Sequence, residues 1–79
     1  MGRTKKLYNT PKVILICDEL DLERILMHLK NGDEVIVNVS NVELKFRYRY
    51  IDFISGYVMA LNGKRCKLEE NIYSFKISI

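Results

Sequence analysis

The segment that most constrains the fold is an apolar helical pattern with a glycine near its middle, between Arg49 and Lys67. Gly56 lies inside this pattern, and Leu61-Asn62-Gly63 ends it. A glycine inside a helix costs roughly 1 kcal/mol relative to alanine, so it usually marks a place where another backbone comes close. We therefore expect this helix to pack tightly against another element or another molecule.

Apolar side chains surround more of this helix than one sheet can cover. At about 100° per residue they form two stripes that span more than half of the circumference, whereas a helix on one sheet needs an arc of only ~100°. The first stripe contains Leu44, Tyr48, Ile51 and Val58, and the second contains Phe46, Tyr50, Phe53, Tyr57 and Leu61. The surplus predicts a homodimer. Its expected interface consists of Asp52, Gly56, Ala60, Phe53 and Tyr57.

Before this helix, the pattern predicts a strand, a helix and a second strand. The apolar run of residues 12–17 is typical of a strand covered on both faces. Asp18 is expected to cap the following helix, and Gly32 to end it in a left-handed conformation. Residues 34–39 are rich in β-branched side chains and predict the second strand.

The long helix is expected to begin at a capping box formed by Ser40 and Glu43. After it, residues 64–68 and 72–79 predict two strands joined by a turn, with Tyr73 and its alternate neighbours on one face. The order is β-α-β-α-β-β, and an extra short strand is left open. We predict an α/β fold, a two-layer sandwich of two helices packed on one sheet, in a homodimer.

Length and composition indicate one small domain. The 79 residues divide into a basic leader, residues 1–11, predicted to be disordered, and a core domain, residues 12–79. A chain this short buries only about 60–65% of the surface that its unfolded form exposes, so pairing with a copy would stabilise it. We find no secretory signal and no apolar run near the roughly 20 residues of a membrane span. The net charge of +3 permits an anionic partner without selecting one.

Residues able to support catalysis are few and scattered. Cys17 and Cys66 fall in predicted strands and are expected to be small buried thiols in a reducing cytosol; a disulfide between them is the alternative. His28 has no cysteine or serine at a motif spacing, and the acids that follow Asp18 are explained by the helix dipole. We predict no catalytic residue, no metal site, no cofactor and no small-molecule substrate.

Four pieces of the sequence, in this order, resemble one known family. They are Lys30-Asn31-Gly32-Asp33-Glu34-Val35-Ile36-Val37-Asn38, Ile51-Asp52-Phe53-Ile54-Ser55-Gly56, Ala60-Leu61-Asn62-Gly63 and Asn71-Ile72-Tyr73-Ser74-Phe75. From Lys12 to Ile79 the chain is similar to the SepF family of cell-division proteins. The resemblance implies a non-enzymatic adaptor that dimerises, binds the C-terminal tail of FtsZ and links the Z-ring to the membrane. It also implies that the protein can assemble further into polymers.

The resemblance implies where the FtsZ tail peptide binds. In SepF proteins a lysine and an aromatic residue six positions apart line the peptide pocket, and Lys67 and Tyr73 have this spacing. Phe53 and Tyr57 of a partner's helix are expected as further walls. The family attaches to membranes through an N-terminal amphipathic helix, whose pattern we do not find in residues 1–10. The implied location is the cytoplasm, at the division site, with peripheral membrane association in a full-length form.

Two other functions remain as alternatives. A small basic dimer can bind nucleic acid, and residues 45–50 alternate cations with aromatic rings, as stacked bases require. On a helix, however, alternate residues point about 200° apart, so this run cannot form one stacking surface. The chain could also be only a structural oligomerisation module. For Gly56, the alternatives to a contact between helices are a tolerated defect in the helix and packing beneath Leu15 or Val37 of its own chain.

Overall fold

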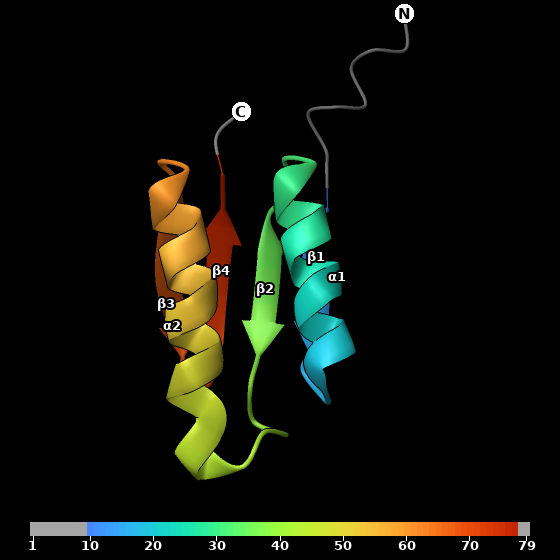
Figure 1. The fold of residues 1–79 in the computed structure, drawn as a ribbon, viewed down its shortest axis with the longest axis vertical. Helices are drawn as coiled ribbons and strands as arrows, with labels where there is room; N and C mark the ends of the chain where they lie inside the picture. Colours follow the sequence, from blue (N-terminus) through green and yellow to red (C-terminus); the bar gives the residue numbers. More distant parts are fainter. Residues whose placement is uncertain (1–9, 78–79) are drawn as a thin grey trace, which may run out of the picture.

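The computed structural model of the chain describes residues 10–77 (Figure 1). Most of the predicted leader, residues 1–11, lies outside the described residues, and so does the end of the last predicted strand, residues 78–79. The order of the elements is the predicted β-α-β-α-β-β, with no fifth strand between residues 10 and 77. The elements are β1 (Lys12–Leu15), α1 (Glu19–Lys30), β2 (Val35–Asn38), α2 (Leu44–Ala60), β3 (Lys64–Glu69) and β4 (Ile72–Lys76).

The four strands form one mixed sheet in the order β1-β2-β4-β3. β1 runs parallel to β2, whereas β4 is antiparallel to both of its neighbours, β2 and β3. Both helices lie on one face of this sheet, with α1 against β1 and β2 and α2 against β3 and β4 (Figure 1). The predicted two-layer α/β sandwich is confirmed, and β1 and β3 form the free edges of its sheet.

The core fills the space between the helices and the sheet. Its residues come from alternate strand positions and from one face of each helix, as the periodicities of strand and helix require. They are Ile14, Ile16, Ile25, Leu29, Val35, Val37, Val39, Ile51, Ile54, Val58, Tyr73, Phe75 and Ile77. The prediction that Tyr73, Phe75 and Ile77 share one face is therefore confirmed, and that face is the one beneath the helices.

The opposite face of the sheet carries no helix (Figure 1). One row of side chains crosses all four strands on this face and consists of Val13, Ile36, Ser74 and Cys66. Val13 is 71% exposed, and Leu15, two positions further along β1, is 46% exposed. The exposed apolar side chains of β1 therefore lie on this open face, whereas Lys64 and Lys76 lie on it at the β3 edge.

The start of α1 agrees with the prediction. The Asp18 side chain accepts hydrogen bonds from the amides of Leu20 (2.9 Å) and Asp21 (3.3 Å), and the Asp21 carboxylate accepts one from the Asp18 amide (3.3 Å). The Cys17 amide donates to the same carboxylate at 2.8 Å, and this bond is the main cause that lowers the pKa of Asp21. Gly32, at φ 89°, ends the helix as predicted.

The predicted start of α2 at a capping box of Ser40 and Glu43 is wrong. Glu43 occupies the cap position but makes no side-chain hydrogen bond there, and the helix begins at Leu44. Arg47 donates from Nε to the Val42 carbonyl (2.7 Å) and from Nη2 to the Ser40 carbonyl (3.1 Å). Arg47 therefore ties residues 40–43 to the side of α2, and the helix begins without a side-chain cap.

The expectation of buried thiols is also wrong, because Cys17 and Cys66 are both exposed and both free. Cys17 follows the end of β1, where the chain has already left the sheet. Cys66 pairs with Ser74 across β3 and β4, so it points to the face that no helix covers. Strand patterning alone does not reveal which sheet face stays open, and this decides the environment of Cys66.

Candidate functional site

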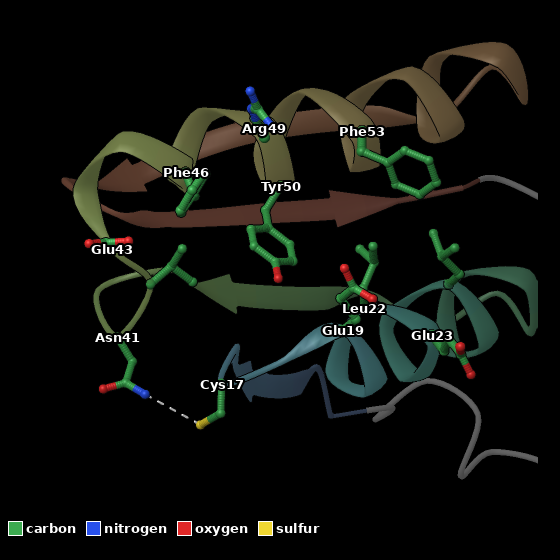
Figure 2. A pocket seen from close by; sticks show the side chains of 12 residues that line it. Cys17, Glu19, Leu22, Glu23, Asn41, Glu43, Phe46, Arg49, Tyr50 and Phe53 are labelled. Atoms are coloured by element: carbon green, nitrogen blue, oxygen red, sulfur yellow. Dashed lines mark hydrogen bonds between the residues drawn. The ribbon is translucent and has the colours of Figure 1, made fainter.

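A groove of about 690 Å³ separates α1 from α2 (Figure 2). Tyr50 and Phe53 point into it from α2, and Leu22 faces them from α1 (Figure 2). Glu19 and Glu23 make its α1 wall acidic, whereas the nearest cation on the α2 wall is Arg49. The other lining residues are Cys17, Leu26, Asn41, Val42, Glu43 and Phe46. The groove therefore combines apolar and aromatic side chains with an acidic α1 wall, and the Arg49 side chain points away from it (Figure 2).

A second and much smaller hollow, of about 30 Å³, lies beside Tyr73. We call it the Tyr73 slot. Its lining residues come from α2, the end of β2 and the β3–β4 turn, and are Val39, Leu44, Arg47, Tyr48, Ile51, Glu70, Asn71 and Tyr73. A slot of this size accepts part of one apolar side chain rather than a small-molecule substrate of ordinary size.

Lys67 and Tyr73 are direct cross-strand partners in β3 and β4. The Lys67 ammonium lies 6.0 Å from the centroid of the Tyr73 ring, within the range of a cation–π contact. Lys67 Nζ also lies 3.4 Å from Glu70 Oε1. The hydrogen bond and the negative charge of Glu70, followed by the nearby Tyr73, raise the pKa of Lys67. The two residues expected at the peptide site therefore lie together in one chain.

Tyr73 points inward, as its place in the alternation of β4 predicts. It is 8% exposed and stacks on Phe75, with ring centroids 6.3 Å apart and planes inclined by 20°. Tyr73 lines the Tyr73 slot, but because its side chain is almost fully buried it offers little open aromatic surface to a ligand. Tyr48, which is 68% exposed on α2, provides the free ring at the slot.

Phe53 and Tyr57, the other residues expected to contact the peptide, do not line the Tyr73 slot. Phe53 lines the groove between the helices, and Tyr57 packs partly buried against the core. Within one chain neither ring thus shares a hollow with Tyr73. Their assignment to the peptide site through a partner's helix stays a prediction.

The ridge of Asp52, Gly56 and Ala60 is exposed along its whole length. A Cβ atom added to Gly56 would have no atom within 4 Å, apart from the helix's own backbone and its chain neighbours. Packing of Gly56 beneath Leu15 or Val37 of the same chain is therefore wrong. Nothing in the described part of the chain explains why this helix keeps a glycine at an exposed position, where alanine would stabilise it.

The basic–aromatic run of residues 45–50 is divided between different surfaces. Lys45 Nζ and Arg49 Cζ lie 5.3 and 5.5 Å from the centroid of the Phe46 ring. Tyr50 points into the groove, whereas Tyr48 lines the Tyr73 slot. The prediction that this run forms no single stacking surface is confirmed.

Metal-binding and catalytic groupings are scarce in the described part of the chain. Between residues 10 and 77 no three His, Cys, Asp or Glu side chains are arranged to hold a metal ion. His28 Nδ1 lies 3.1 Å from Asp33 Oδ2 at the end of α1, a local pair remote from both hollows.

Sequence patterns did not identify the residues that surround Lys67 and Tyr73. Arg47, Tyr48, Glu70 and Asn71 reach the slot because α2 crosses the end of the β3–β4 hairpin. The sequence held one local signal, because Glu70 follows Lys67 by three residues and precedes Asn71. In the structure Asn71 adopts a positive φ of 68° at the turn. Asparagine tolerates this conformation, so a tight turn returning Glu70 toward Lys67 could have been proposed.

A sequence model of the family described as "Cell division protein SepF" matches residues 12–75. The protein named SepF 2 from Desulforamulus reducens is 38% identical over 55 residues, which cover 70% of this chain and 34% of the relative. SepF from Heliobacterium modesticaldum is 37% identical over 65 residues, covering 78% of this chain and 40% of that relative. The chain thus spans about a third to two fifths of the length of these curated relatives.

A solved structure has the same fold. The SepF-like protein from Pyrococcus furiosus superimposes with a TM-score of 0.74 over 89% of this chain and 92% of that chain. The two sequences are 22% identical, so this likeness supports the arrangement of helices and strands only.

Proposed function

The chain belongs to the SepF family of cell-division proteins, and on this premise we propose that it is a non-enzymatic adaptor that binds the C-terminal tail of FtsZ at the Tyr73 slot. One observation carries the proposal: the Lys67 ammonium lies over the Tyr73 ring, beside a narrow hollow that apolar and polar side chains line together. A cation next to an apolar slot suits a flexible peptide with an acidic residue close to an apolar one.

Binding would order the flexible tail along the β3 edge of the sheet. An apolar side chain of the tail enters the slot between Tyr48 and Tyr73, and a carboxylate of the tail pairs with Lys67. Because the tail loses conformational entropy when it is ordered, we expect a weak single-site affinity. Two linked sites in a dimer would raise the apparent affinity by avidity.

We further propose that self-association uses two surfaces on opposite sides of the domain. The ridge of Asp52, Gly56 and Ala60 allows two α2 helices to approach closely, because its side chains are small. The open sheet face, with Val13 and Leu15, is the second apolar surface. Two separate two-fold contacts on one small domain produce an open chain of molecules, and this supports the capacity to polymerise.

The proposed role also includes the link between the Z-ring and the membrane at the division site. No helix in residues 10–77 is both long and apolar enough to cross a bilayer. The surfaces described above would supply FtsZ binding and self-association. Recruitment of the assembly to the membrane is part of the proposal that rests on family membership alone.

The binding site is tested by reversing one charge. We expect Lys67→Glu to weaken the binding of a synthetic FtsZ tail peptide by about five-fold or more, since it places a carboxylate where the ligand carboxylate binds. Isothermal calorimetry of the wild type and the variant measures this ratio. Lys64→Glu is the matched control, because it makes the same charge change in β3 on the opposite face of the sheet.

Lys64→Glu should change the affinity less than two-fold. Equal weakening by both variants would show that only the overall charge matters, and would contradict a site at Lys67. A labelled oligonucleotide is titrated in parallel. Binding of the oligonucleotide with a steep salt dependence, in the absence of peptide binding, would favour the nucleic-acid alternative.

A further inference from the structure

The cation at the proposed peptide site is already paired within its own chain. Glu70 Oε1 lies 3.4 Å from Lys67 Nζ, and the Glu70 side chain also lines the Tyr73 slot. The ligand carboxylate and Glu70 would therefore use the same ammonium group. A binding site rarely gains from a carboxylate of its own at the point where it must receive another carboxylate.

The backbone around Glu70 is held in place, whereas its side chain is free to move. Asn71, at a φ of 68°, closes the β3–β4 turn, and Arg47 Nη1 donates to its Oδ1 at 3.3 Å. The register of the hairpin shifts between Lys67 and Glu69, which brings the turn back toward β3. The Glu70 side chain is nevertheless 76% exposed, and that of Lys67 is 50% exposed. Glu70 can thus leave Lys67 by rotating into water while the turn stays folded.

We propose that Glu70 is a built-in competitor that occupies Lys67 in the free protein and is displaced by an acidic residue of the bound peptide. This inference rests on the proposed function, since it concerns the same peptide site. Glu70 lowers the affinity for every anionic ligand, because its pairing with Lys67 must be broken and its charge remains nearby. It therefore makes the site selective, as repulsive elements do in specific interfaces. A ligand binds well only if it also fills the slot beside Tyr73.

Removal of the Glu70 charge tests this proposal. An exposed ion pair contributes little, so we expect Glu70→Gln to bind the FtsZ tail peptide about three-fold more tightly than the wild type in low salt. Glu69→Gln is the matched control, because it removes the same charge from the neighbouring residue, whereas in the described structure Lys67 forms its ion pair with Glu70. Glu69→Gln should change the affinity for the peptide by less than half as much as Glu70→Gln does. Thermal unfolding verifies that both variants are folded.

Two further measurements assign the effect to Lys67. In a Lys67→Gln background, Glu70→Gln should no longer strengthen binding, because the group for which it competes is absent. A tail peptide with its acidic residues replaced by amides should bind the wild type and Glu70→Gln equally.

The outcomes separate this inference from the proposed function. If the wild type binds the tail peptide and Glu70→Gln binds no better than Glu69→Gln, the competitor role is overturned and the peptide site stands. Weaker binding by Glu70→Gln than by the wild type would show that Glu70 contacts the ligand favourably. This result would also overturn the competitor role. If neither the wild type nor Glu70→Gln binds the peptide, both proposals fail, because Glu70→Gln should bind the peptide more tightly than the wild type.

Discussion

A Gly63→Ala variant is expected to lose about 3 kcal/mol of unfolding free energy, at the upper end of the cost of overpacking. A Cβ atom at this position would lie 2.5 Å from the Lys76 carbonyl oxygen, 2.6 Å from Val58 Cγ1 and 3.0 Å from the Val58 carbonyl oxygen. Two of these atoms belong to the backbone and cannot rotate away. The Gly63 amide also donates to the Val58 carbonyl at 2.8 Å, so the turn after α2 cannot open without losing this bond. Urea denaturation measures the difference.

Gly56→Ala is the control for this variant. No atom lies within 4 Å of an added Cβ there, so alanine should raise the stability of the dilute protein by about 0.5–1 kcal/mol through its helix propensity. The two glycines lie seven positions apart and should therefore respond in opposite directions. A Gly63→Ala variant as stable as the wild type would contradict the close approach of α2 to β4.

The second large effect is expected on self-association. Gly56→Lys should weaken dimerisation by about a hundred-fold or more, because it places a long charged side chain where two helices meet at small residues. The fold itself should survive, since the position has no neighbour within 4 Å. Sedimentation equilibrium over a range of concentrations measures the dimer dissociation constant.

Met27→Lys provides the comparison for this experiment. Met27 is 61% exposed on α1, away from the predicted ridge, so a lysine there should leave the dimer intact. An unchanged assembly of folded Gly56→Lys would rule out the Gly56 contact. The open sheet face with Val13 and Leu15 would then be the surface to test for dimerisation.

The fold was largely predictable because its elements follow local rules. Asp18 is a strong helix cap followed by helical periodicity, and the alternation in β4 required Tyr73 to face the core. Both predictions are confirmed. Ser40 failed as a cap because the helix begins only at Leu44, which leaves Ser40 outside its first turn, where Arg47 binds the Ser40 carbonyl. A tertiary hydrogen bond of this kind cannot be recognised from spacing alone.

The candidate site was only partly predictable. Spacing and family resemblance selected Lys67 and Tyr73, and the hairpin register indeed makes them neighbours. The Tyr73 slot forms where α2 packs on the β3–β4 hairpin, and sequence patterns do not reveal this packing. Tyr48 and Glu70, which line the slot, were therefore missed. The groove between the helices was missed for the same reason, since Leu22 and Phe53 meet only when both helices lie on one sheet face (Figure 2). Packing between elements, and not propensity, creates these surfaces.

The most direct test of the central claim is an NMR titration of the ¹⁵N-labelled chain with the FtsZ tail peptide. If the tail binds at the Tyr73 slot, the largest changes in amide chemical shift should occur at Lys67, Asn71 and Tyr73. Smaller changes are expected along the rest of β3, and residues that line the groove, such as Leu22, should not shift. Changes confined to Leu22, Phe53 and their neighbours, or no saturable change at any residue, would contradict the proposed site.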